Sequence, residues 1–169
     1  MKILHAPDLH SVYDNYGKVG SDGVHSRLAE WRKCADTILE TAIRENVDVA
    51  VFPGDLFRTS RPRAMEQIEV YSLFDKLRRE KIKVVAIAGN HDLVAPGEPS
   101  AVDVLSRVGE KSFGVTMPKI VTAKDVQFVC LPSVKAAVIN AACSDPAEAA
   151  TMVSNKLMDI ARSMRALCD

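Results

Sequence analysis

Two stretches decide the fold: residues 47–55 read Val-Asp-Val-Ala-Val-Phe-Pro-Gly-Asp, and residues 82–92 read Ile-Lys-Val-Val-Ala-Ile-Ala-Gly-Asn-His-Asp. Each is an apolar run, rich in β-branched residues, that ends in glycine and polar residues. Such runs predict buried strands, here at residues 47–52 and 82–88, each followed by a tight turn. A further strand is expected at residues 3–6, with Asp8-Leu9-His10 directly after it.

Helical periodicity lies between these strands. Apolar residues recur at helical spacing over residues 26–46 and again over residues 62–81. Three strands alternating with two helices predict an α/β fold with a mostly parallel sheet, covered on both faces and joined by right-handed crossovers. The rest of the chain predicts a short helix capped by Ser100, strands at 119–123 and 125–131, and a last helix from Asp145 to about Cys168.

Polar residues that could carry chemistry follow each of the first three strands. The carboxyl ends of neighbouring parallel strands meet at one edge of a sheet, where open α/β sheets bind ligands. That edge would gather six polar side chains: Asp8, His10, Asp55, Asn90, His91 and Asp92. Carboxylate, imidazole and amide groups suit Mn²⁺, iron or Zn²⁺. Because one carboxylate can bridge two ions, and two ions can act on both oxygens of a phosphate ester, the pattern predicts a two-metal phosphoesterase site.

These motifs resemble those of the calcineurin-like metallophosphoesterases and, within them, the SbcD-type DNA double-strand-break repair exonucleases. The matching residues are 8–10 (Asp-Leu-His), 54–57 (Gly-Asp-Leu-Phe) with Pro62 after them, and 89–92 (Gly-Asn-His-Asp). The Gly-Asp-x-Phe form favours the nuclease branch over protein phosphatases. The resemblance covers nearly all of residues 1–135 and implies a layered sandwich of mostly parallel strands with flanking helices.

The same resemblance implies roles for the site residues. Asp8, His10 and Asp55 would hold the first of two divalent ions, with Mn²⁺ as the expected metal. Asp55 and Asn90 would begin the second metal site. His91 would act on the scissile phosphate, with Asp92 orienting it.

The resemblance also implies partners. The substrate would be DNA, and the partner an SMC-like ATPase. The first two helices of the nuclease domain also contribute to a homodimer interface in the resembled family, which gives Trp31 and the apolar stripe over residues 65–74 a second possible use besides the core.

Two features depart from the family pattern. Pro7, directly before Asp8, removes a backbone amide and stiffens the loop. The family also completes its site with later histidines, including a Gly-His-x-His motif, whereas the last histidine of this chain is His91. We therefore expect residues 1–169 to be the N-terminal portion of a nuclease domain, incomplete at its C-terminus. Its metal occupancy would be partial or confined to the first site.

The composition sets bounds on partners and location. With 22 basic and 22 acidic residues the net charge is zero, so any DNA contact must come from local patches. Arg58, Arg61 and Arg63 are candidates for phosphate contacts, and a solvated loop is the alternative. No secretory signal precedes the first strand and no stretch approaches the roughly 20 apolar residues of a membrane span. We expect a cytoplasmic protein with reduced cysteines and no membrane partner.

Two other functions compete with the nuclease hypothesis. The same fold could serve a phosphodiesterase or phosphatase that acts on a nucleotide or another small phosphate ester. A non-catalytic dimerisation or binding module is the third hypothesis, favoured by the missing histidines and opposed by the intact motifs. Among the remaining residues, we expect His5 and Trp31 in the core and His25 as a helix cap or surface residue.

Overall fold

The central sheet is parallel and its strands follow chain order. The computed structural model describes residues 1–11, 16–95, 97–107, 112–134 and 145–168. The sheet order is β1 (Ile3–His5), β2 (Val49–Pro53), β3 (Lys83–Ile87) and β4 (Ser112–Val115). Helices α1 (Ser26–Arg44), α2 (Ala64–Arg79) and α3 (Ala101–Leu105) connect these strands in turn. An antiparallel hairpin of β5 (Lys119–Ala123) and β6 (Val126–Cys130) follows, and then helix α5 (Pro146–Ala166).

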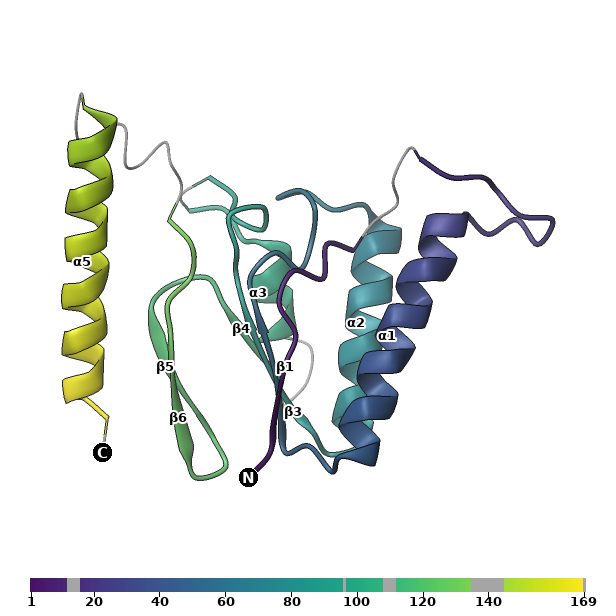
Figure 1. The fold of residues 1–169 in the computed structure, drawn as a ribbon, viewed down its shortest axis with the longest axis horizontal. Helices are drawn as coiled ribbons and strands as arrows, with labels where there is room; N and C mark the ends of the chain where they lie inside the picture. The colour runs from purple at the N-terminus through teal and green to yellow at the C-terminus, as the bar shows by residue number, and fades with distance from the viewer. Residues whose placement is uncertain (12–15, 96, 108–111, 135–144, 169) are drawn as a thin grey trace.

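The layers follow from this strand order. Because each crossover moves one strand further in the same direction, right-handed connections place α1, α2 and α3 on one face of the sheet, as Figure 1 shows. The β5–β6 hairpin lies at the opposite face, and α5 lies beyond the hairpin (Figure 1). The predicted α/β fold with a mostly parallel sheet is confirmed. Helices cover one face of that sheet and a hairpin covers the other.

Two apolar cores lie on either side of the sheet. On the helical face, side chains such as Phe52 and Val84 pack with the buried faces of α1, α2 and α3. On the other face, Val49, Val85 and Val115 pack against Val121 and other residues of the hairpin. The alternation of faces along β2 and β3 explains why β2 is apolar throughout and β3 is apolar after Lys83.

Strand β1 is the exception, because only one of its faces is covered. Leu4 packs into the helical core, whereas Ile3 is 47% exposed and His5 is exposed on the other face. The hairpin covers β2, β3 and β4 but does not extend over β1. The expectation that His5 lies in the core is therefore wrong: it sits on an edge strand that the hairpin leaves bare.

Strand β4 was not expected from the sequence. It is four residues long and contains Gly114, which lowers its strand propensity. The glycine is required because helix α3 approaches closely: a Cβ at Gly114 would lie 1.9 Å from the carbonyl oxygen of Val102. Because Gly114 has no side chain, α3 can pack closely against this edge of the sheet.

The other expected elements agree with the structure to within about two residues at each end. The cap expected at His25 is present, since its Nδ1 accepts from the backbone N–H of Arg27. Trp31 is half-buried against the helical core. Cys34, Cys130 and Cys168 are free thiols, and Cys143 lies outside the described residues. No helix among the described residues is long and apolar enough to cross a membrane.

Candidate metal centre

Three loops leave the carboxyl ends of β1, β2 and β3 and meet at one edge of the sheet. The first two run side by side as a short backbone ladder. The N–H of Asp8 donates to the carbonyl of Gly54 (3.3 Å), and the N–H of His10 donates to that of Asp55 (2.9 Å). The N–H of Ser11 donates to the carbonyl of Leu56 (3.0 Å). Main-chain hydrogen bonds alone therefore hold the first two motifs in place relative to each other.

Asp8, His10 and Asp55 form a group that could hold a metal ion. One ligand atom from each lies within 4.8 Å of the others. The Nε2 atom of His10 is 3.8 Å from Oδ1 of Asp8 and 3.9 Å from Oδ2 of Asp55. Ligands about 2.1 Å from one ion, at tetrahedral or right angles, are about 3.0–3.5 Å apart. The two His10 distances exceed this range by a few tenths of an ångström, and side-chain rotations of the exposed Asp8 can close the rest, so the donor set fits one divalent ion.

The backbone of all three residues is in an unusual conformation. The φ angles of Asp8, His10 and Asp55 are 55°, 37° and 45°, in the left-handed region that few non-glycine residues adopt. Such conformations cost roughly 1–3 kcal/mol each and persist where the surroundings enforce them, commonly at functional sites. The strain falls on the same three residues that could bind the ion, which makes a mere surface turn a poor explanation of the group.

Asn90 and His91 approach this group from the third loop. Asn90 is exposed and lines a cleft of about 320 Å³ together with Asp8 and Asp55. The N–H of His91 donates to Oδ1 of Asp55 (3.0 Å), and its ring lies edge-on to that of His10 with 5.3 Å between centroids. The structure thus brings five of the six predicted site residues together at one edge of the sheet, and Asp8, Asp55 and Asn90 line the cleft there.

The ring of His91 is oriented by the main chain. Its Nδ1 atom lies 2.8 Å from the carbonyl oxygen of Arg58. Because a carbonyl can only accept, Nδ1 carries the proton in this contact and Nε2 is left with its lone pair in the neutral ring. His91 therefore presents Nε2 as the atom that could accept or, when protonated, donate a proton.

Asp92 does not perform the role expected of it. We expected its carboxylate to orient His91, but it is 1% exposed and turned away from the cleft, into the sheet edge. Its Oδ2 accepts from the N–H groups of Leu56 (3.1 Å) and Gly89 (2.9 Å), and its Oδ1 from that of Phe57 (2.9 Å). Burial raises the pKa of the Asp92 carboxyl, and the three N–H donors oppose this rise.

The arginines after Asp55 have partners of their own. The guanidinium of Arg61 pairs with Glu98 (3.1 Å) and that of Arg63 with Glu66 (2.8 Å). Arg61 is nonetheless 80% exposed at its side chain, and its partner carboxylate is about half-exposed. The Arg61 pair can exchange for a phosphate at little cost, because exposed ion pairs contribute only about 0–1 kcal/mol.

Two contacts at the cleft were missed by sequence reasoning. The indole N–H of Trp31 donates to the carbonyl of Leu9 (3.3 Å), which ties the first ligand loop to α1. Ser133 lines the same cleft as Asp55, and its N–H donates to the carbonyl of Ala88 (3.0 Å). A polar residue directly after the strand at 125–131 was the available signal for Ser133, while nothing in the sequence singles out the Trp31 contact.

The comparisons with known proteins agree with this site. Residues 1–139 match the model of the calcineurin-like phosphoesterase family. Since the match covers most of the chain, the protein belongs to this family. Its fold and its strand-end motifs are those of a metallophosphoesterase.

Three relatives illustrate the similarity. The DNA double-strand break repair protein Mre11 of Archaeoglobus fulgidus is 34% identical over 92 residues, or 54% of this chain. The SbcD component of the nuclease SbcCD is 35% identical over 95 residues in Escherichia coli K12 and 37% identical over 93 residues in Bacillus subtilis. The matched segments span 19–22% of the relatives' own lengths. The similarity is thus to an SbcD-type metallophosphoesterase, over about one fifth of each relative.

Proposed function

We propose that this chain contributes the first part of a metal-dependent nuclease site that hydrolyses phosphodiester bonds in DNA during repair or recombination. The observation that carries the proposal is the strained group of Asp8, His10 and Asp55, whose ligand atoms lie within 4.8 Å of one another. The names of the relatives, a DNA double-strand break repair protein and a component of a nuclease, support the choice of substrate.

Each side chain of the site has a proposed role that follows from its position. Asp8, His10 and Asp55 would hold the first ion, and Asp55 with Asn90 would begin the second. Bound divalent ions, Mn²⁺ in our proposal, supply Lewis acidity toward a phosphate ester and lower the pKa of a coordinated water. The Nε2 atom of His91, left unprotonated in the neutral ring by the contact of Nδ1, could hold a proton on the scissile phosphate or on the departing oxygen.

The second ion is expected to be weakly held by this chain. Asp55 and Asn90 are two ligands, and Asp55 is shared with the first site. Sites with few protein ligands keep open positions that water or substrate must fill. Because the last histidine is His91, we propose that residues outside residues 1–169 complete this second site and that the chain is the N-terminal portion of a larger nuclease domain.

The partners are part of the same proposal. The name of the SbcCD relative describes one component of a complex, and we propose an SMC-like ATPase as the partner of this chain also. The exposed arginines after Asp55 offer cations near the cleft for a DNA backbone. A phosphodiesterase acting on a small nucleotide remains the second candidate, since neither the zero net charge nor the open cleft selects a polymer.

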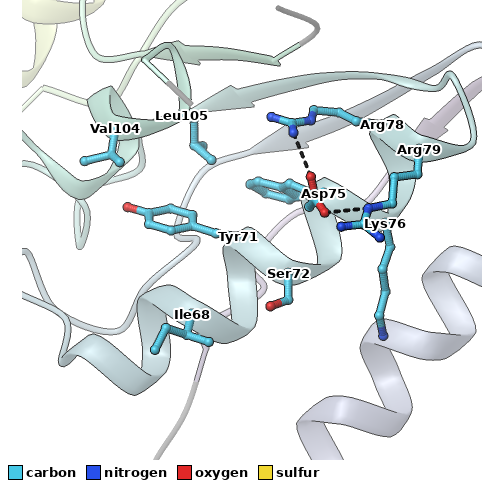
Figure 2. Close-up of a pocket in the computed structure, with 10 residues that line it drawn as sticks. Ile68, Tyr71, Ser72, Asp75, Lys76, Arg78, Arg79, Val104 and Leu105 are labelled. Atoms are coloured by element: carbon cyan, nitrogen blue, oxygen red, sulfur yellow. Dashed lines mark hydrogen bonds and ion pairs between the residues drawn. The ribbon is translucent and has the colours of Figure 1, made fainter. Parts of the chain in front are cut away.

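We also propose that a second copy of the chain packs on helices α2 and α3. A groove of about 500 Å³ lies between these helices, and Figure 2 shows Ile68, Tyr71, Val104 and Leu105 around it. Ile68 is 56% exposed and Met65, one turn earlier on α2, is 47% exposed. Of the residues that we expected at an interface, Phe74 is buried and Trp31 is half-buried in the core. Met65 and Ile68 remain exposed and could contact a partner.

The dimer proposal is tested by sedimentation of the wild type beside Ile68→Lys. A charge placed on the groove should shift the chain to monomer. Met158→Lys is the matched control, because Met158 is 52% exposed and belongs to α5, which lies on the other side of the sheet from α2 (Figure 1). Equal sedimentation of all three proteins as monomers would contradict the proposal.

The activity is tested by Mn²⁺-dependent cleavage of linear duplex DNA, beside an Asp55→Asn variant that keeps the side-chain volume. Cleavage by the wild type that the variant lacks supports the nuclease. Hydrolysis of a small nucleotide diester without any cleavage of DNA would favour the second candidate. No hydrolysis of either substrate, with Mn²⁺ still bound, would favour a binding module.

A further inference from the structure

The second and third ligand loops are joined differently from the first and second. The first pair is joined by three hydrogen bonds between main-chain groups. The second pair is joined through side chains. The buried carboxylate of Asp92, in the third loop, accepts from the N–H groups of Leu56 and Phe57 in the second. The contacts of His91 with the Asp55 carboxylate and the Arg58 carbonyl join the same two loops. The Asp92 carboxylate also closes its own loop by accepting from the N–H of Gly89. Side-chain contacts, with the buried Asp92 carboxylate among them, thus take the place of the main-chain ladder.

The Asp92 carboxylate holds the main chain directly beside two residues that would bind the metal. Leu56 directly follows Asp55, and Gly89 directly precedes Asn90. The third loop also donates the N–H of His91 to Oδ1 of Asp55, while Oδ2 of Asp55 is the oxygen that faces His10. If the third loop moves relative to the second, Asp55 loses the donor that orients its carboxylate, and Asn90 moves away from the cleft.

Asp92 is held in turn by Ser100. The hydroxyl of Ser100 donates to the main-chain carbonyl of Asp92 (2.8 Å) and accepts from the N–H of Val102 (3.1 Å). Ser100 is 2% exposed and is the residue that caps helix α3. Its backbone N–H is fixed by Asp103 (2.7 Å). The start of α3 therefore sets the position of the residue that joins the two ligand loops.

We propose that Asp92 and Ser100 are positioning residues that fix the distance between the Asp55 loop and the Asn90 loop, and thereby set the affinity of the site for its metal ion. The inference rests on the proposed metal centre. Neither side chain touches the cleft: Asp92 acts through the main chain of residues 56, 57 and 89, and Ser100 acts through Asp92. Groups that orient metal ligands in this way commonly change metal affinity 10–100-fold when they are replaced.

The test measures Mn²⁺ binding by calorimetry on the 169-residue chain, with the metal-free unfolding midpoint recorded for each variant. Asp92→Asn places a donating amide against N–H groups, and we expect about 10–100-fold weaker Mn²⁺ binding. Ser100→Ala removes the bond to Asp92, and we expect a several-fold loss. Thr116→Val is the matched control: it removes a bond to Asp103 (2.6 Å) in the first turn of the same helix but does not reach Asp92.

The result expected is a loss of Mn²⁺ affinity in Ser100→Ala that Thr116→Val does not share, although both lower the metal-free midpoint. Equal affinity in Ser100→Ala and the wild type would overturn the proposal, and so would an equal loss in Thr116→Val. If Asp92→Asn does not fold, Ser100→Ala alone decides. A wild-type chain that binds no Mn²⁺ would instead refute the proposed metal centre itself.

Discussion

The two ends of the central sheet use the same backbone conformation for different reasons. At the amino end, Asn46 and Lys81 have φ angles of 52° and 63°, and each follows the end of a helix, α1 or α2. A left-handed residue two places after the last helical one is an ordinary way to close a helix. At the carboxyl end, Asp8, His10 and Asp55 have φ angles of 37–55°, and no helix ends there.

The arrangement of charged residues also differs between the two ends of the sheet. At the amino end, Asp48 accepts from the backbone N–H of Lys2 (2.7 Å) and from the ammonium group of Lys124, so these two opposite charges are paired. At the carboxyl end, the carboxylates of Asp8 and Asp55 belong to one group within 4.8 Å. Like charges gathered on strained backbone lower stability, and they are retained where a ligand compensates for them. The amino end thus stabilises the fold, whereas the carboxyl end has the features expected of the proposed metal site.

Gly89→Ala is expected to give the largest effect on this comparison. A Cβ at Gly89 would lie 2.3 Å from the backbone nitrogen of Asp55 and 2.1 Å from its Oδ1, so the second and third loops must separate. We expect a loss of about 2–4 kcal/mol in the free energy of unfolding, together with loss of Mn²⁺ binding. Urea unfolding and a Mn²⁺ titration measure the two effects.

Gly23→Ala serves as the control for Gly89→Ala. Gly23 has a φ of 76° and nothing within 4 Å of the added carbon, so only backbone strain of about 1 kcal/mol is expected and metal binding should stay intact. A Gly89→Ala protein that binds Mn²⁺ as tightly as Gly23→Ala would show that the two loops need not touch.

Asp8→Asn is expected to raise stability while it weakens binding. Removing one of two carboxylates that lie within 4.8 Å relieves a repulsion of about 1 kcal/mol in water. The metal-free chain should therefore unfold at higher urea concentration, and its Mn²⁺ affinity should fall at least tenfold. Asp36→Asn, which breaks an exposed pair with Lys76 (3.2 Å), should have the opposite sign on stability and leave binding unchanged. Destabilisation by Asp8→Asn would contradict the strained-site interpretation.

Asp48→Asn tests the amino end, where the smallest effect is expected. The hydrogen bond from Lys124, followed by that from the backbone of Lys2, lowers the pKa of the Asp48 carboxyl in the folded chain. A group whose pKa is lowered on folding stabilises the protein above its ordinary pKa and loses this contribution as pH falls through the lowered value. Wild type and Asp48→Asn should thus differ slightly in stability at pH 7 and converge below about pH 3.9. A difference that grows at low pH would refute the assignment.

Much of the fold could be predicted from periodicity, and the exceptions have physical causes. The strands β2 and β3 are apolar because both faces are buried, so their pattern is unambiguous. Strand β4 was missed because Gly114 has no side chain to report burial, although the close approach of α3 depends on that absence. His5 was wrongly expected in the core. Its strand is buried on one face only, and three residues show too little alternation to tell the buried face from the exposed one.

Part of the candidate site could likewise be predicted from the sequence, and part of it could not. The convergence of Asp8, His10 and Asp55 follows from parallel topology, which the alternation of strands and helices already indicated. The function of Asp92 could not be read from its motif, because a carboxylate beside a histidine looks the same whether it faces the ring or the main chain. Ser100 was recognised as a helix cap, but its bond to Asp92 spans eight residues of loop that no local pattern describes.

The bare edge of β1 bears on how copies of this chain meet in concentrated solution. Among the described strands, β1 has a neighbour on one side only, and Ile3 is exposed beside that free edge. An unpaired edge invites strand addition by another molecule, the first step of sheet-like aggregation. Here the edge is three residues long, with Lys2 before it and Pro7 two residues after it, a charge and a missing amide that both oppose growth of an intermolecular ladder. Pro7, which departs from the family pattern beside the candidate metal centre, is therefore also expected to oppose strand addition at this edge.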